Sequence, residues 1–274
     1  MVDPSPLQAW GVHLVHEAVL CASMVTDADA EGLIAVWQRF RAHHGDRIRW
    51  QSDGSGRWKK ASRSMWDRFE AQVHKRRAIL SWDLHAGETC DGVGPAAPAL
   101  SLLASDGELT LRWVEGDAPA PWSELAAHLG TRWGYAGRGL FGPAYSEATQ
   151  GRHDPIGDAL QADPFLGPTH PTTWGAIELG VCHIGPVLIL GEALVAALGG
   201  ADAVRDRAAS LGVGVDACGH ALCLTLGEPP SAEAARGLWA WLAPVRPDDT
   251  LLDEMTWVPG LTMDEMSAWA ARWA

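Results

Sequence analysis

The sequence contains few lysines and no long apolar run. Only three of its 21 basic residues are lysines, while arginine, alanine, glycine and tryptophan are abundant, a bias typical of GC-rich codon usage. No stretch reaches the roughly 18 consecutive apolar residues of a membrane-spanning helix, so no such span is expected. Residues 1–10 contain no Lys or Arg and include Pro4 and Pro6, so we expect no secretory signal peptide there.

Cysteine is also scarce and shows no regular spacing. The five cysteines, Cys21, Cys90, Cys182, Cys218 and Cys223, are odd in number and lack the pattern of a disulfide framework. We therefore expect reduced thiols and a cytoplasmic location.

The overall composition predicts a large hydrophobic core. Hydrophobic residues make up 47% of the 274 residues and charged residues 20%, which excludes disorder over most of the chain. Fifteen tryptophans are present. Because each buries about 150–250 Å², most are expected in the core, and an exposed one would be a candidate for a binding hot spot.

Charge is distributed unevenly along the chain. The 21 basic and 34 acidic side chains give a net charge of −13. Twelve basic but only four acidic residues lie between Arg39 and Arg77, which leaves 9 basic against 30 acidic, or −21, in the rest. An uneven distribution of charge is informative about the binding partners of a protein rather than about its fold. The acidic remainder repels nucleic acid and attracts basic proteins.

Hydrophobic periodicity predicts a mixture of strands and helices. The expected strands are 11–22, 78–86, 99–104, 108–114, 135–146, 213–217 and 221–226. The expected helices begin near Thr26 and Ser64, cover 122–133, 191–198, 201–211 and 231–242, and end with one capped by Thr262 and Glu265. Because the two types do not alternate strictly, we expect an α+β fold with mainly antiparallel sheets packed against helices.

The chain is interpreted as one domain, residues 1–274. A Gly/Pro/Ala-rich stretch at 91–98 is a candidate boundary between two similar sheet-and-helix units, an N-terminal unit of residues 1–90 and a C-terminal unit of residues 99–274.

No motif for catalysis or for a cofactor is complete. Residues 137–142 (GRGLFG) match G-x-G-x-x-G, but Pro143 follows where a dinucleotide site needs a helix to begin. His16-Glu17 begins like H-E-x-x-H, yet Leu20 stands where the second histidine is needed. We therefore predict no catalytic residue and no cofactor.

One group of residues has the types of side chain that bind metal. Cys218, His220 and Cys223 lie within six residues, but no second pair with zinc spacing is nearby. Cys182 and His183 could complete a site only through the tertiary structure. We favour a hairpin whose cysteines behave as small apolar residues, with no metal.

The segment from Arg39 to Arg77 supports an alternative function, nucleic-acid binding. Its basic side chains alternate with Trp50 and Trp58, a composition that contacts phosphates and stacks bases. Against this alternative, the two helices expected in the segment have clear apolar faces, and the net charge of −13 opposes attraction to a polyanion. An exposed stripe of these basic side chains would favour it.

Four segments carry a resemblance to a known family. They are residues 134–141 (GYAGRGLF), 173–200 (TWGAIELGVCHIGPVLILGEALVAALGG), 211–230 (LGVGVDACGHALCLTLGEPP) and 235–246 (ARGLWAWLAPVR). Together they resemble the bacterial type VI immunity proteins, over roughly two thirds of the chain. The chain departs from the family pattern in its Pro/His-rich residues 151–172 and at Glu228-Pro229-Pro230.

The resemblance implies an immunity-type domain that is not an enzyme. Such proteins bind and neutralise toxin effectors of type VI secretion systems, some with VRR-NUC-type nuclease domains, and so protect the producing cell. The implied partner is therefore a cognate toxin effector, and a nuclease would present a basic surface. No membrane is implied.

An acidic stretch is the predicted contact surface for such a toxin. Residues 247–271 contain no Lys or Arg. Their six carboxylates are Asp248, Asp249, Asp253, Glu254, Asp264 and Glu265.

Overall fold

The computed structural model describes most of the chain. The described residues are 4–9, 11–22, 27–52, 57–76, 82–88, 90, 97–105, 108–114, 122–141, 155–166, 180–247, 264, 267–268 and 271–273. The strands are β1 His13–Ala22, β2 Trp50–Ser52, β3 Lys59–Lys60, β4 Trp82–His85, β5 Ser101–Ser105, β6 Glu108–Trp113, β7 Thr131–Phe141, β8 Val187–Leu190, β9 Gly214–Cys218 and β10 Ala221–Thr225. The helices are α1 Pro4–Ala9, α2 Asp27–His44, α3 Arg63–Arg76, α4 Trp122–His128, α5 Pro155–Ala162, α6 Glu192–Ala197, α7 Ala201–Ser210 and α8 Ala232–Trp241.

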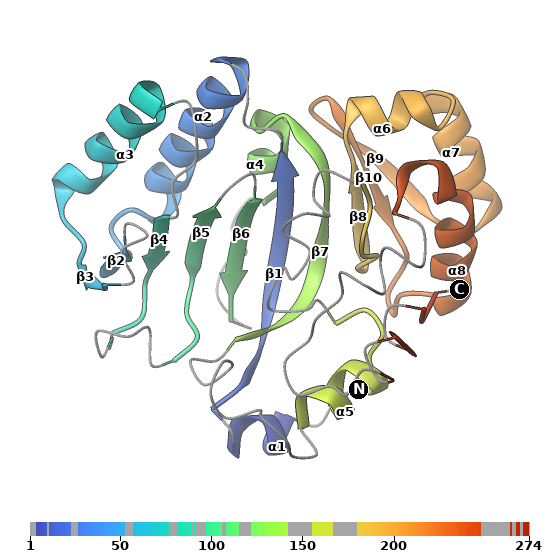
Figure 1. The fold of residues 1–274 in the computed structure, drawn as a ribbon, viewed down its shortest axis with the longest axis horizontal. Coiled ribbons are helices and arrows are strands. Elements are labelled where there is room, and N and C mark those ends of the chain that lie inside the picture. The colour runs from blue at the N-terminus through green and yellow to red at the C-terminus, as the bar shows by residue number, and fades with distance from the viewer. Residues whose placement is uncertain are drawn as a thin grey trace.

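The strands form one ten-stranded sheet in the described part of the chain. Its order is β3-β2-β4-β5-β6-β1-β7-β8-β10-β9, and every pair of neighbours is antiparallel. The long strand β1 lies between β6 and β7 near the middle of the sheet (Figure 1). The predicted α+β class with antiparallel strands is confirmed.

Two groups of helices cover opposite faces of the sheet. Successive side chains of a strand point to opposite faces, so β1 contributes to two cores. Ala18 and Leu20 belong to the first core with α2, α3 and α4, whereas Val19 and Cys21 belong to the second core with α6, α7 and α8. Figure 1 shows α2 and α3 over one end of the sheet and α6 to α8 at the other.

Aromatic side chains fill the first core, as the tryptophan content predicted. Trp37 of α2 is fully buried and stacks on Phe69 of α3 with ring centroids 3.7 Å apart. Trp82 of β4 meets the same two rings edge-on. These contacts hold α2 and α3 against the sheet, since aromatic pairs stabilise beyond the area they bury.

Several predicted elements are confirmed with small shifts in their bounds. The hairpin of residues 99–104 and 108–114 is the pair β5 and β6, with Leu102 opposite Leu111. Ser231 begins α8 as expected, because its side chain accepts a 3.1 Å hydrogen bond from the amide of Ala234. The predicted caps at Thr26 and at Thr262 lie outside the described residues.

One predicted helix is too long. Residues 122–133 were expected to be helical, but α4 ends at His128 and Trp133 lies in β7. The tertiary structure decides this, because Trp133 pairs with Cys21 of β1 and Leu190 of β8 and packs in the second core. The short helix α1 has no counterpart in the sequence prediction.

The sheet continues across the proposed boundary at 91–98. Strand β4 precedes this stretch and pairs with β5, which follows it, with Leu84 opposite Leu102. None of the described helices is long and apolar enough to cross a bilayer.

Candidate functional site

The predicted acidic surface falls mostly outside the described residues. Of its six carboxylates, Asp264 is described and its side chain is exposed. The other five, Asp248, Asp249, Asp253, Glu254 and Glu265, lie outside the described part, so their predicted role stays a prediction.

Both ends of the acidic stretch are anchored to the C-terminal half of the fold. At its start, the guanidinium of Arg246 lies 4.5 Å from the ring centroid of Trp239 and donates to the Trp239 carbonyl at 3.3 Å. At its end, Arg272 donates to the Pro164 carbonyl at 3.1 Å and contacts the ring of His183. Trp273 is buried in the second core. The stretch therefore begins and ends on the same side of the sheet.

The basic segment forms a second candidate surface. Its basic side chains at positions 39, 41, 49, 57, 59, 60, 63, 68 and 75 are exposed. Its tryptophans behave differently, because Trp66 is buried and Trp50 and Trp58 are half-buried. The sequence therefore located a basic surface correctly, but the aromatic rings that would stack bases are largely covered.

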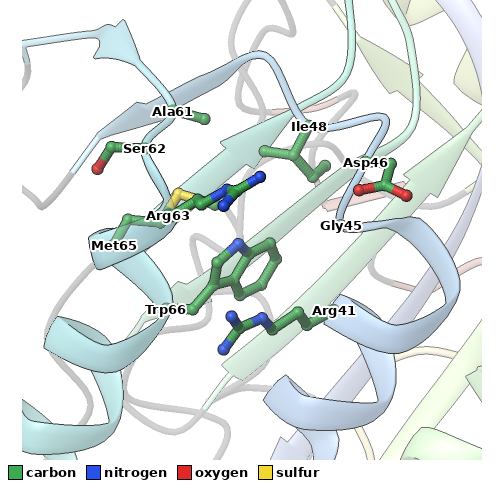
Figure 2. Close-up of a pocket in the computed structure, with 9 residues that line it drawn as sticks. All are labelled: Arg41, Gly45, Asp46, Ile48, Ala61, Ser62, Arg63, Met65 and Trp66. Atoms are coloured by element: carbon green, nitrogen blue, oxygen red, sulfur yellow. The ribbon is translucent and has the colours of Figure 1, made fainter.

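A hollow of about 450 Å³ lies within this basic surface, between the end of α2 and the start of α3. Its lining residues are Arg41, Gly45, Asp46, Ile48, Ala61, Ser62, Arg63, Met65 and Trp66 (Figure 2). Figure 2 shows the guanidinium groups of Arg41 and Arg63 on either side of the Trp66 indole. The hollow thus combines two cations, the carboxylate of Asp46 and one aromatic ring.

The charges around the hollow are only weakly compensated. The guanidinium of Arg41 lies 5.7 Å from the centroid of Trp66 and 3.5 Å from a carboxylate oxygen of Asp67. The side chain of Asp67 is 77% exposed, so this ion pair contributes little. Among the residues that the structure describes, no carboxylate pairs with Arg63.

A buried polar cluster lies on the opposite face of the sheet from α2 and α3. Glu17 of β1 stands directly opposite Arg112 of β6, and their Oε2 and Nε atoms are 3.3 Å apart. The hydroxyl of Tyr135 donates to Oε1 of Glu17 at 2.8 Å. The ring of His183 meets Tyr135 edge-on at 4.5 Å between centroids. Strands β6, β1 and β7 thus bring together groups that are far apart in the sequence.

Burial shifts the titration of this cluster. Burial raises the pKa of Glu17, while Arg112 and the hydrogen bond from Tyr135 act in the opposite direction. Burial lowers the pKa of His183 well below its ordinary value, and the charge of Arg272 lowers it further. Burial also raises the pKa of the nearby Asp83 to about 6. Glu17, Tyr135 and His183 all have partners in the fold, so we interpret the cluster as structural.

Sequence reasoning missed this cluster, although it placed Glu17 on a strand. The available signal was a carboxylate within the apolar strand 13–22, since a buried charge requires a partner. The partners themselves could not be identified, because Arg112 is 95 residues away and Tyr135 118.

Residues 137–141 of the glycine-rich match lie on strand β7, and Gly142 lies outside the described residues. Gly137 and Gly139 are part of β7, and other side chains approach both of them closely. A Cβ at Gly139 would lie 2.2 to 2.6 Å from the carboxylate atoms of Glu17, and a Cβ at Gly137 would lie 2.5 Å from Pro186. These glycines therefore make room for side chains.

The Cys218, His220 and Cys223 group is the predicted hairpin of β9 and β10. Both cysteines are buried in the first core, whereas His220 is exposed in the turn. The thiol of Cys218 donates to the Ser123 carbonyl at 3.0 Å, which joins this hairpin to α4. Within the described residues, no three His, Cys, Asp or Glu side chains converge as metal ligands would.

Comparison with known proteins finds similarity in structure rather than in sequence. No protein-family model matches the chain, and no curated protein matches its sequence. Among solved structures, the fold is similar to that of the T6SS protein PA0821 of Pseudomonas aeruginosa, with a TM-score of 0.68 at 13% sequence identity. The match covers 96% of this chain and 82% of that chain. At this identity the similarity shows the shared fold.

Proposed function

We propose that the chain is an immunity protein, which binds a cognate antibacterial effector and blocks its active surface. The observation that carries this proposal is the fold shared with a T6SS-associated protein over 96% of the chain. The resemblance of four sequence segments to type VI immunity proteins supports the same assignment. The protein would act in the cytoplasm of the producing cell, by binding and without turnover of a substrate.

The charge of the protein suits this role. A nuclease effector grips phosphates with a basic surface, and an acidic protein can occupy that surface in place of DNA. Opposite charges also accelerate the encounter of two proteins. The acidic stretch of residues 247–271 is the proposed contact, since it carries six carboxylates and no Lys or Arg.

Co-expression tests the proposal. The chain is expressed in a bacterial host together with the product of the open reading frame next to its own gene, as the candidate effector, and both survival and co-purification are measured. Survival of the host together with a stable complex is the expected result. An unrelated effector serves as the control, because a chain that merely improves host fitness would protect against both toxins. Undiminished killing by the adjacent effector would overturn the assignment.

Nucleic-acid binding is a second candidate, and the exposure of the basic side chains between Arg39 and Lys75 favours it. A labelled DNA duplex and a labelled single strand should then be retarded by the protein at low salt and released at higher salt. The absence of retardation at low salt would exclude this candidate.

A further inference from the structure

The hollow between α2 and α3 has the chemistry of an oxyanion site. Arg41 comes from the last turns of α2 and Arg63 is the first residue of α3, and both line one space of about 450 Å³. A guanidinium offers several N–H donors in a plane, which matches the two oxygens of a carboxylate. The N-terminal end of α3 adds a partial positive charge on the same side.

The aromatic side chain in the hollow supports the same chemistry. Trp66 is 5% exposed, because its ring packs tilted against Trp37 with centroids 4.8 Å apart. Its face is therefore closed to a nucleobase. In Figure 2 the indole nitrogen of Trp66 lies on the side of Arg63, where its N–H is a further hydrogen-bond donor.

We propose that this hollow binds a carboxylate from an acidic segment of the effector. The inference rests on the proposed function and adds a second contact to it. The partner would be basic where it meets the acidic remainder of this chain, which carries −21, and acidic where it meets the segment from Arg39 to Arg77, which carries +8. Charge complementarity at both an acidic and a basic surface fixes the orientation of a complex, because a partner bound in the reversed orientation would place like charges together.

A protein segment fits the observations better than a nucleic acid. Binding of a single strand relies on exposed aromatic faces that stack successive bases. Trp37 and Trp66 are buried and Trp50 and Trp58 are half-buried, and the rest of the surface repels a polyanion over long distances. One compact space with two guanidinium groups matches one or two carboxylates.

Asp46 lines the hollow and should repel an acidic ligand. It lines the space, its side chain is exposed, and its charge has the same sign as the proposed ligand. Its removal should therefore strengthen binding, whereas removal of either arginine should weaken it. Opposite effects from neighbouring exposed residues are not expected from a general loss of structure.

The test is calorimetric titration of the full chain with a blocked hexaglutamate peptide. The double variant Arg41→Gln with Arg63→Gln should weaken binding by about tenfold or more. The control variant Arg39→Gln with Arg68→Gln removes the same charge from exposed positions on the same two helices, outside the hollow, and should change affinity by about twofold at most. Asp46→Asn should tighten binding. Equal losses in the two double variants would show nonspecific attraction and overturn the inference.

Two further titrations separate the possible failures. A single-stranded oligonucleotide that binds through Arg41 and Arg63 more tightly than the peptide would overturn the choice of a protein ligand. With the purified effector, the Arg41→Gln and Arg63→Gln variant should dissociate faster than the control variant. If both variants bind the effector equally well, the inference fails while the immunity function stands. If the effector does not bind the unmodified chain, the proposed function fails, and the peptide titration still decides whether the hollow is an oxyanion site.

Discussion

The hydroxyl of Tyr135 donates a 2.8 Å hydrogen bond to the carboxylate of Glu17, a side chain that is 1% exposed. This contact joins β7 to β1 near the middle of the sheet, where Arg112 of β6 approaches the same carboxylate from the other side. A buried carboxylate is costly unless it is paired and hydrogen-bonded. The three groups therefore stabilise the centre of the fold as a unit.

Tyr135→Phe should lower the free energy of unfolding by about 1–3 kcal/mol, because it leaves a buried carboxylate oxygen without its donor. The ring contact with His183 is kept, so the change isolates the hydroxyl. Urea unfolding measures the effect. In a Glu17→Gln background the same change should cost less, and equal costs in both backgrounds would show that the two groups are not coupled.

Gly139→Ala should destabilise the protein by about 1–3 kcal/mol or more, since the new methyl group would collide with the carboxylate of Glu17. Gly214→Ala is the matched control. It also places alanine in a strand, but the nearest atom to its Cβ is 3.8 Å away. Thermal unfolding should separate the two variants, and similar melting temperatures would contradict the close approach of β7 to Glu17.

Asp83 should make the protein less stable as pH rises from about 4 to about 6. Burial raises the pKa of Asp83 from 3.8 to about 6, so within this range the folded chain holds a proton that the unfolded chain has released. The free energy of unfolding therefore falls as pH rises through this range, and stays low above it. One oxygen of Asp83 is buried without a hydrogen-bond partner among the described residues, which agrees with a preference for the neutral form.

Asp83→Asn should remove this pH dependence. In the unmodified protein Asp83 should lower the free energy of unfolding by up to about 3 kcal/mol between pH 4 and pH 6. Urea unfolding at several pH values measures it. Asp67→Asn, at a side chain that is 77% exposed, should leave the pH dependence unchanged. A wild-type slope that persists in the Asp83→Asn variant would assign the effect to the other buried carboxylates, Glu17 and Glu108, whose pKa values are also raised by burial.

Neutralising the acidic stretch should slow association with a basic effector and flatten its dependence on salt, because electrostatic attraction acts mainly on the association rate. The variant carries Asn or Gln at Asp248, Asp249, Asp253, Glu254, Asp264 and Glu265. Stopped-flow association at several salt concentrations measures the effect. As a control, an equal number of exposed carboxylates is neutralised on α7 and α8 and at other positions away from the stretch. Unchanged rates in the first variant would place the contact elsewhere.

The sequence identified most elements but could not position their ends. The strand at residues 11–22 was recognisable from its run of β-branched and apolar residues although both of its faces are buried, and the hairpin of β5 and β6 was marked by the turn residues between its strands. The end of α4 was wrong by five residues, since local helical spacing continues to Trp133. Pairing with β1 and β8 decided that residue, and pairing between distant strands cannot be deduced from a local pattern.

For the candidate surfaces, too, the sequence predicted the charge, and the tertiary structure decided the geometry. The basic segment was evident from composition, yet its hollow requires the end of α2 and the start of α3 to meet, which depends on how Trp37, Trp66 and Phe69 pack. The acidic stretch was equally evident, and the anchors at Arg246 and Arg272 were not.

By itself, the sequence determined the α+β class, the burial of most of the tryptophans that the structure describes and the separation of charge along the chain, because these follow from residue types and short-range periodicity. Only the tertiary structure decided that a single sheet carries helices on opposite faces at its two ends, that Glu17 pairs with Arg112 and accepts a hydrogen bond from Tyr135, and that Arg41 and Arg63 share one hollow. Each of these depends on contacts between residues far apart in the chain, and their free energy exists only once the sheet has assembled.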